Sequence, residues 1–533
     1  MRKGSLTGLL AVVVLMTFAP SAEAGLEKRV TLPDGVTQRL TYKVPLEQVT
    51  AGQNKIRSLS VAQSGRPAVD GWITGFAHNL VRTADSSVPS SDKVMFHHGV
   101  WVNRTTYEIF YASGEEKTQL LLPRGYGYRY RAGDEWSLNE MIHNLTPKPM
   151  NLSVIYTIDF IPDTSAAAAG ITRALPIWID TQRGIYPVFD VHKGSGGRDG
   201  EFTYPADADD PYGGEHWNER TLRQDGVLID SIGHLHTGGL STELFLRRKG
   251  AHYAGPVCKR PRDRSRTRKR LKRYRACLGK RPTVRGNRAR VFESKAHYFE
   301  PAGPVSWDMA MVGTRNDWRV RVEAGDTLEV QATYETKIAS WYESMGSNLL
   351  WWVPGGKGGS DPFSTKVDTP GRLNHGHYPE NDVHGGGLPV VGRDPAKRPD
   401  GLLSGGPFEI GGYSYEAGNF RLPGSTGNPP VVEKGERFTF QMTGPDLDRE
   451  VWHSLTSCKA PCNKSTGIAY PIADGEFQFD SGQLGDAGPP TVGRTTWSTP
   501  ANLPVGTHTY FCRIHPLMRG SFRVKPKERG NRE

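Results

Sequence analysis

The sequence predicts an all-β fold built from several β-sandwiches. The chain has 533 residues, enough for three domains of ordinary size, and it is rich in glycine (62) and proline (38). Short runs such as 106–111 and 151–158 are dense in β-branched and aromatic residues. Because turn residues punctuate these runs, the pattern favours short strands packed as sandwiches over long helices.

Residues 1–24 have the pattern of a secretory signal peptide. Two basic residues precede an apolar run from Leu9 to Phe18, and an Ala-Glu-Ala cleavage site ends at Ala24. The run is too short for a membrane span, and no later stretch approaches twenty apolar residues. We therefore expect a soluble mature protein that starts near Gly25 and is exported to the periplasm, the cell wall or the extracellular space.

Composition divides the expected mature chain into five segments. Two β-rich blocks are separated by small residues at 166–170, and a segment rich in glycine, proline and histidine follows them. A third β-rich block then precedes a polar tail. The predicted boundaries are 25–170 for the first sandwich, 171–355 for the second, 356–406 for the linker, 407–525 for the third sandwich and 526–533 for the tail.

Near the C-terminus, a C-x2-H-x2-M spacing puts Cys512, His515 and Met518 on one tight loop. Soft sulfur with imidazole selects copper, and two histidines, one cysteine and a weak axial methionine form the blue-copper site. The second imidazole must come from elsewhere, and His453 lies at the end of an earlier strand. A zinc-binding or disulfide-bonded cysteine is the alternative.

About the last 125 residues resemble the cupredoxin family, of the amicyanin and plastocyanin type. The likeness includes the loop just described, the segment 429–432 before Gly435, and the strand from Arg437 to Phe440. It implies a Greek-key β-sandwich that holds a type 1 copper. The ligands implied by the resemblance are His453, Cys512, His515 and Met518.

Five cysteines in an exported chain leave one unpaired if the others form disulfides. With Cys512 assigned to metal, Cys258 pairs with Cys277 and Cys458 with Cys462. The alternative is that the C-x3-C pair holds a metal, although this spacing more often staples a loop. The odd count is thus consistent with copper at the fifth cysteine.

Histidines of the first block suggest a metal set made of His97, His98 and His143. Adjacent residues on a strand point to opposite faces, so the His-His pair shares one ion only if the backbone bends there. Three imidazoles suit copper, with zinc as a competitor. Ordinary polar histidines are the alternative.

A second set lies in the second block, where His234 and His236 form an H-x-H pair. Residues i and i+2 of a strand share a face, so both imidazoles reach one ion without distortion. Met345 precedes a long apolar strand and would complete a His2Met set soft enough for Cu(I). Plain packing is the alternative role for this methionine.

Together these motifs resemble the type II copper, ascorbate-dependent monooxygenases, which include the peptidylglycine α-hydroxylating and dopamine β enzymes, and their plant stress-nodulin relatives. The likeness spans roughly residues 70–355 and follows the family's order of ligands. It implies two jelly-roll-like β-sandwiches, an electron-transfer copper and an oxygen-activating catalytic copper. The implied ligands are His97, His98 and His143 for the first copper, and His234, His236 and Met345 for the second.

This sequence departs from the peptide-hydroxylating enzymes where they bind substrate. Ile232 stands where those enzymes have an arginine for the substrate carboxylate. Ser347 and Leu349 replace an asparagine and a tyrosine, and the family's disulfides are missing from these blocks. The resemblance therefore supports copper binding more strongly than it supports the family's substrate. A peptide with a C-terminal glycine is disfavoured as the substrate.

Two further segments have unassigned chemistry. In the linker, His375, His377 and His384 either form a fourth metal site or lie in solvent. Segment 258–290 has sixteen Lys and Arg residues against one acidic residue. The net charge of the remaining chain is therefore near −4, although the whole chain carries +11. Such a block is typically a solvated, disordered loop. An anionic envelope polymer is its candidate partner, while the absence of interleaved aromatics disfavours nucleic acid.

The function predicted from these motifs is an exported multi-copper oxidoreductase. The sandwiches would hold one or two type 2-like coppers, of which the His2Met copper would activate O2 for hydroxylation of an unknown small substrate and the tri-His copper would store a second electron. The type 1 copper would bring electrons from a small reductant or a redox protein. No catalytic serine triad, carboxylate pair or phosphate loop competes for the chemistry. The alternative is a non-catalytic copper-binding, electron-transfer or storage protein of the envelope, and a weaker one is an adhesin that uses the basic segment.

Overall fold

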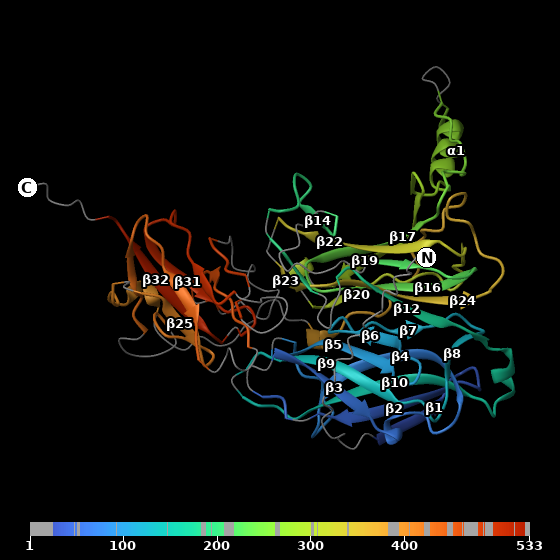
Figure 1. The fold of residues 1–533 in the computed structure, drawn as a ribbon, viewed down its shortest axis with the longest axis horizontal. Coiled ribbons are helices and arrows are strands. Elements are labelled where there is room, and N and C mark those ends of the chain that lie inside the picture. Colours follow the sequence, from blue (N-terminus) through green and yellow to red (C-terminus); the bar gives the residue numbers. More distant parts are fainter. Residues whose placement is uncertain are drawn as a thin grey trace, which may run out of the picture.

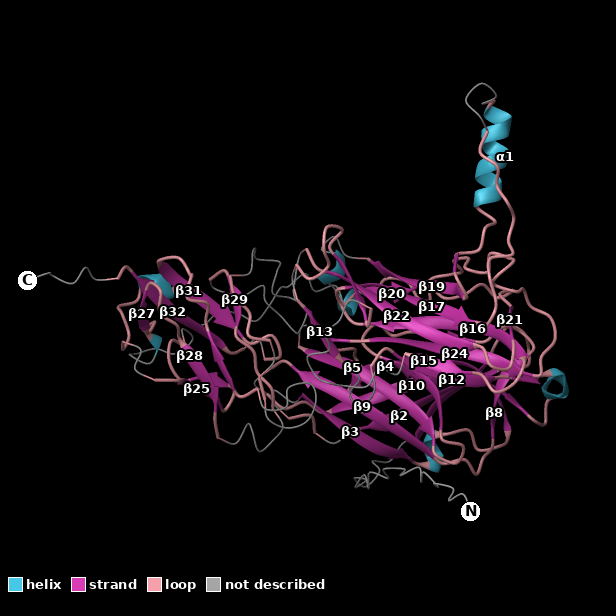
Figure 2. Ribbon diagram, turned by 45° about the horizontal axis from the view of Figure 1, so that its top comes forward, coloured by secondary structure: helices cyan, strands magenta, loops and turns pink. Residues whose placement is uncertain are grey.

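A computed structural model describes residues 25–527 except 47, 51–53, 92, 147, 183–187, 193, 207–217, 262–266, 300–302, 306, 338–340, 382–393, 404–405, 420–426, 445–450, 461, 463–477, 483, 486–493 and 516. The predicted signal peptide, His384 and most of the predicted tail lie outside the described residues. Strands dominate the fold (Figures 1 and 2), so the all-β prediction is confirmed. No helix among the described residues is long and apolar enough to cross a membrane.

Two sheets form the N-terminal sandwich. The larger sheet has the order β1-β2-β10-β4-β8-β11, with β7 on β4. Its strands are β1 (Gly25–Thr31), β2 (Gln38–Pro45), β4 (Gly71–Arg82), β7 (Leu120–Leu121), β8 (Tyr126–Tyr130), β10 (Leu152–Pro162) and β11 (Thr172–Arg173). The smaller sheet has the order β3-β9-β5-β6, with β3 (Asn54–Val61), β5 (Val94–Asn103), β6 (Glu108–Ser113) and β9 (Trp136–Asn144).

Three sheets follow in the second β-rich block. The first has the order β12-β24-β16-β21, with β12 (Leu175–Asp180), β16 (Gly226–Leu235), β21 (Val320–Val322) and β24 (Gly346–Pro354). The second has the order β14-β22-β17-β19-β18, with β15 on β22 and β20 on β19. Its strands are β14 (Glu201–Tyr204), β15 (Glu219–Thr221), β17 (Gly239–Arg247), β18 (Val284–Arg285), β19 (Arg288–Tyr298), β20 (Met309–Met311) and β22 (Thr327–Glu335). The third sheet pairs β13 (Phe189–Val191) with β23 (Trp341–Ser344).

The C-terminal block has two four-stranded sheets with a core of its own. One has the order β26-β25-β28-β30, with β25 (Phe408–Gly411), β26 (Ser414–Tyr415), β28 (Thr439–Met442) and β30 (Thr496–Ser498). The other has the order β27-β32-β31-β29, with β27 (Val431–Glu433), β29 (Thr456–Cys458), β31 (Gly506–Phe511) and β32 (Arg519–Lys525). Figure 1 places these sheets beside the larger body, at the end that carries β3, β9 and β23.

The first two sandwiches share one hydrophobic core. A single cluster of buried side chains includes Trp101 of the first sandwich and Trp341 of the second. The rings of Tyr128 and Trp351 also meet across the two blocks, with centroids 5.8 Å apart. Because close-packed interiors resist sliding, this shared core holds the histidines of the two sandwiches in a fixed relation.

Part of the basic segment is a helix rather than a loop. α1 (Arg268–Leu278) projects away from the second sandwich, as Figure 1 shows, and none of its residues is buried. The Thr267 side chain accepts a hydrogen bond from the Arg270 N–H, which is a standard helix N-cap. Arginine, lysine, leucine and alanine are good helix formers, so the charge run is locally compatible with a helix.

Both predicted disulfides are present. Cys258 is bonded to Cys277, which lies in the last turn of α1, and Cys458 is bonded to Cys462. Cys512 is the free cysteine of the described residues and is buried. The structure therefore leaves a single protected thiol, at the position where the sequence predicts a metal ligand.

The remaining regular elements are short 3-10 turns. They are η1 (Gln63–Gly65), η2 (Ala166–Gly170), η4 (Gly303–Val305), η5 (Pro379–Asn381) and η6 (Pro395–Lys397). Among them, η5 lies within the predicted linker, where Lys117 of the first sandwich forms an ion pair with Glu380 at 3.3 Å. Part of this linker is therefore packed on the first sandwich rather than extended in solvent.

Candidate metal centres

Three of the four predicted copper ligands of the C-terminal block converge in the interior. The Cys512 Sγ lies 3.8 Å from Nδ1 of His453 and 3.9 Å from Nδ1 of His515, and the two nitrogens are 3.2 Å apart. All three side chains are buried, and their ligand atoms lie within 4.8 Å of one another. One thiolate and two imidazoles at these separations fit a copper ion held by a His2Cys set.

Two backbone contacts fix the loop between the cysteine and the methionine. The Met518 N–H donates to the His515 carbonyl at 2.8 Å, and the Cys512 N–H donates to the Met518 carbonyl at 3.1 Å. Met518 is buried in the core of the same block. The C-x2-H-x2-M spacing thus closes a compact turn at the end of β31, and the fourth predicted ligand lies on that turn.

Hydrogen bonds and neighbouring imidazoles prepare the cysteine for metal. The backbone N–H groups of Ser454 and His515 donate to the Cys512 sulfur at 3.4 and 3.3 Å. Burial alone would raise the pKa of the Cys512 thiol, but the hydrogen bonds and charges of His453 and His515 outweigh it and lower this pKa to about 5. The thiolate, which is the metal-binding form, is therefore favoured at neutral pH.

A buried guanidinium lies directly behind this site. Arg513 is fully buried, and its Nη1 is 3.4 Å from a carboxylate oxygen of Asp480. Burial lowers the pKa of Arg513 to about 10, opposed by the charges of Asp480 and of Asp190 on β13. Since Asp190 belongs to the second β-rich block, Arg513 couples the C-terminal block to that block electrostatically.

The histidines of the first two sandwiches meet at their shared boundary. The rings of His97 and His143 stack with centroids 4.6 Å apart, and the His236 ring of the second sandwich meets the His97 ring at 4.3 Å. The β5–β9 register shifts between Phe96 and His98, so His97 sits in a β-bulge. The bulge bends the backbone locally at the His97-His98 pair.

Glu343 completes this group, and we call His97, His143 and Glu343 the boundary cluster. Oε2 of Glu343 lies 3.6 Å from Nε2 of His97 and 3.9 Å from Nε2 of His143, and all three side chains are buried. Burial is the main factor that lowers the pKa of both histidines, and for His143 the charge of His515 comes next. Because such a contribution falls with distance, it indicates that His515 of the C-terminal block lies near the boundary cluster.

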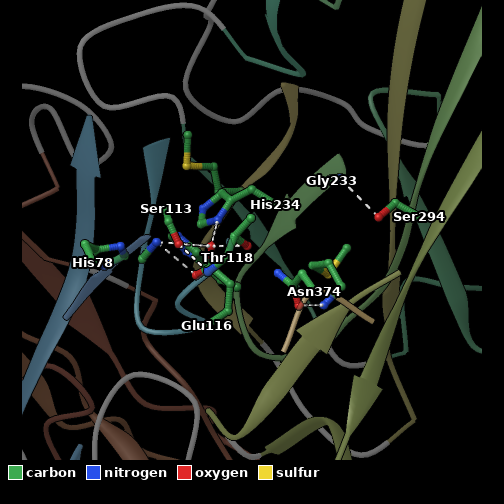
Figure 3. Close-up of polar contacts among 12 residues, drawn as sticks. His78, Ser113, Glu116, Thr118, Gly233, His234, Ser294 and Asn374 are labelled. Atoms are coloured by element: carbon green, nitrogen blue, oxygen red, sulfur yellow. Dashed lines mark hydrogen bonds and ion pairs between the residues drawn. The ribbon is translucent and has the colours of Figure 1, made fainter. Parts of the chain in front are cut away.

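The other predicted ligands of the sandwiches have different partners. Nε2 of His98 lies 3.1 Å from Oδ1 of Asn139. Nδ1 of His234 lies 2.7 Å from Oε1 of Glu116, as Figure 3 shows. The Met345 N–H donates to the Tyr334 hydroxyl at 3.1 Å, and extending the β16–β24 register by one residue sets Met345 opposite His236.

Glu116 is the centre of a buried polar network. Besides His234, its carboxylate accepts hydrogen bonds from Ser113 and from the Gly114 N–H at 3.0 Å (Figure 3). Burial opposes the charge of both partners, but their attraction outweighs it, raising the pKa of His234 and lowering that of Glu116 to about 2. This attraction favours the protonated imidazole and the ionised carboxylate over their neutral forms.

Two of the linker histidines are also engaged. His375 is largely buried and contacts the Glu116 carbonyl, and its Nδ1 lies 2.7 Å from the Gly376 carbonyl. His377 contacts the Asp308 carboxylate. Hence these two histidines contact protein oxygens, and the third member of the predicted fourth site, His384, lies outside the described residues.

The sequence analysis missed the two acids that organise the sandwich histidines. Glu343 lies in a strand next to two aromatic residues, and Glu116 follows another acid in a short turn between strands. For Glu343 the signal is a charge directly after two aromatic residues, because a charged side chain is buried only when paired or bound to metal. Glu116 gives no such signal, and in neither case does the local sequence identify the partner, which comes from the other sandwich.

Solved structures give only weak likenesses. The Cu(I) form of an amicyanin mutant is 16% identical, covers 26% of this chain and 94% of its own, and has a TM-score of 0.14. A reduced form of another amicyanin mutant is 17% identical, with 24% and 82% covered and a TM-score of 0.13. PNGase F, a glycosylasparaginase from Flavobacterium meningosepticum, is 10% identical, with 62% and 98% covered and a TM-score of 0.24. No profile of a known family matches the chain, and no curated protein matches it.

We expect Gly114→Ala to disturb the boundary cluster. A Cβ on Gly114 would overlap the His97 carbonyl oxygen, which is backbone and cannot rotate away. We expect a loss of about 1–3 kcal/mol in unfolding free energy, measured by urea denaturation. Gly133→Ala is the control, because a Cβ there has nothing within 4 Å, and equal losses in both variants would contradict this packing.

Proposed function

We propose that the protein is an exported copper redox protein whose C-terminal block is a one-electron carrier. The observation that supports this most directly is the buried convergence of His453, Cys512 and His515. Copper bound there supplies Cu(II)/Cu(I) chemistry, and Met518 is its proposed axial ligand. The N–H groups on the sulfur tune the potential, and burial excludes water from the site.

We further propose that the carrier serves a second metal centre among the sandwich histidines. The His515 imidazole is near enough to affect His143, so electrons would have a short route between the two sites. The proposed reaction is copper-dependent oxygen activation for hydroxylation of a small substrate, with electrons from an external reductant or redox protein. The resemblance to the type II copper monooxygenases implies that the ligands of the catalytic copper are His234, His236 and Met345.

The alternative is an electron-transfer or copper-storage protein without catalysis. The departures at the substrate positions favour it. The contact between His234 and Glu116 also favours it, because a carboxylate, and not a metal ion, is the partner of this predicted ligand. The two functions differ in one measurable respect. A carrier exchanges electrons without consuming O2, whereas an oxygenase consumes O2 in proportion to the reductant supplied.

Oxygen uptake by the copper-loaded full chain with ascorbate is the test. We expect His236→Ala to lower the rate at least about tenfold, since losing one ligand or orienting group typically costs 10–100-fold. The blue absorption should remain in that variant, because His236 is not a predicted ligand of the carrier site. His297→Ala, at an exposed position on β19, is the control. Wild-type uptake no faster than that of free copper would favour the carrier function instead.

A further inference from the structure

The spacing between Glu343 and the two histidines of the boundary cluster is that of ligands around a metal ion. The distances of 3.6 and 3.9 Å from Glu343 Oε2 to His97 and His143 are longer than hydrogen bonds. Ligand atoms that each lie about 2.0–2.2 Å from one ion are roughly 3–4 Å apart. The three groups therefore converge on a common point, at a separation that one ion would fill.

Buried ring nitrogens without partners lie beside this group. Within the described part of the chain, neither ring nitrogen of His143 has a hydrogen-bond partner, and Nε2 of His236 has none either. Both side chains are buried. Leaving buried polar atoms unsatisfied is costly, roughly 1–3 kcal/mol for each group, and coordination of an ion would satisfy them.

The backbone of Glu343 orients a further nitrogen donor. Its carbonyl contacts Nδ1 of His236, which makes that nitrogen the protonated one and leaves Nε2 with its lone pair. Fixing one ring nitrogen on a carbonyl is the usual way of orienting a metal-binding histidine. Glu343 also has φ of +51°, and strained conformations of this kind cluster at functional sites.

We propose that one divalent transition-metal ion binds between the two sandwiches, held by His97 and His143 of the first and by Glu343 of the second, with His236 as a fourth donor. This set replaces the two separate sets implied by the resemblance. Its donors are imidazole nitrogen and carboxylate oxygen, which favour a divalent ion, in contrast to the softer His2Met set that favours Cu(I). An ion of coordination number above four keeps positions open beyond these four donors for O2 or substrate.

The other two histidines support this centre from outside. His98 contacts Asn139 and His234 contacts Glu116, so the proposal gives both histidines a positioning role rather than a ligand role. Because its ligands come from both sandwiches, the ion would also bind the sandwiches together. The inference rests on the proposed function only for its supply of electrons, since ion binding itself needs nothing from the C-terminal site.

The test is a metal count in the full chain with the carrier site disabled by His453→Ala and Cys512→Ser. In this background we expect one Cu(II) per chain by calorimetric titration, with imidazole nitrogen coupling in its electron paramagnetic resonance spectrum. Glu343→Gln and His143→Asn should each weaken binding about tenfold or more. Met345→Leu, two residues from the glutamate and similar in volume, should change the affinity less than about twofold.

Two bound ions, no bound ion, or loss of binding in Met345→Leu would overturn the proposal. Unchanged affinity in both Glu343→Gln and His143→Asn would do so as well. Circular dichroism of each variant separates lost binding from lost folding, and thermal stabilisation by added metal gives a readout independent of activity. The proposed carrier function fails differently, through absence of blue absorption in the wild type.

Discussion

Replacing Cys512 with serine is expected to abolish the intense visible absorption that Cu(II) gives the wild-type protein. In a His2Cys site, that absorption arises from charge transfer between the thiolate sulfur and copper, and a hydroxyl cannot replace the sulfur. The serine variant keeps His453, His515 and Met518, so it can still bind copper weakly. We therefore expect colour to disappear entirely while some copper remains bound, as measured by absorption and elemental analysis of the same sample.

The double variant Cys458→Ser/Cys462→Ser is the matched control. It removes two sulfur atoms from the same block, but they form a disulfide and do not belong to the metal cluster. Blue absorption should persist in this variant with unchanged band position. Colour that survives in Cys512→Ser, or a wild-type protein that stays colourless with bound Cu(II), would exclude the type 1 copper assignment.

Arg513→Ala is expected to destabilise the C-terminal block by about 3–5 kcal/mol, because it leaves the carboxylate of Asp480 without its buried counter-charge. Burial already raises the pKa of Asp480 to about 7, which shows how unfavourable its charge is there. Loss of blue absorption during urea denaturation measures the unfolding of this block separately from the sandwiches. This separation matters because a chain with several domains need not unfold in one step.

Lys525→Ala is the control for the arginine. Lys525 also pairs with an aspartate, Asp400, but the lysine side chain is 47% exposed and the aspartate 34% exposed. Exposed pairs contribute about 0–1 kcal/mol, so the urea midpoint should change little. Similar shifts in the two variants would mean that the buried charge of Arg513 has no special role.

Parts of the fold and the site followed from local sequence. The all-β fold comes from short runs of β-branched and aromatic residues between turns, which is a property of neighbouring residues. The spacing of Cys512, His515 and Met518 closes within one turn, and only His453 had to come from a distant segment of the chain. The disulfide pairs followed from the number and spacing of the cysteines.

α1 shows a limit of composition as a guide. The density of Lys and Arg predicted a solvated loop, and solvation was the correct part, since none of the helical residues is buried. The Thr267 cap and the Cys258–Cys277 bond are small local features within the charge run. Charge alone describes the exposure of a segment better than its backbone conformation.

What the sequence determined by itself was the chemistry available: a β-rich chain, a free thiol among imidazoles, and histidine pairs able to bind metal. Only the tertiary structure decided which of those side chains face one another. Glu343 meets His97 and His143 because the two sandwiches share a core, and Glu116 holds His234 for the same reason. Contacts between residues more than a hundred positions apart depend on how whole sheets pack, and no local pattern in the sequence encodes that packing.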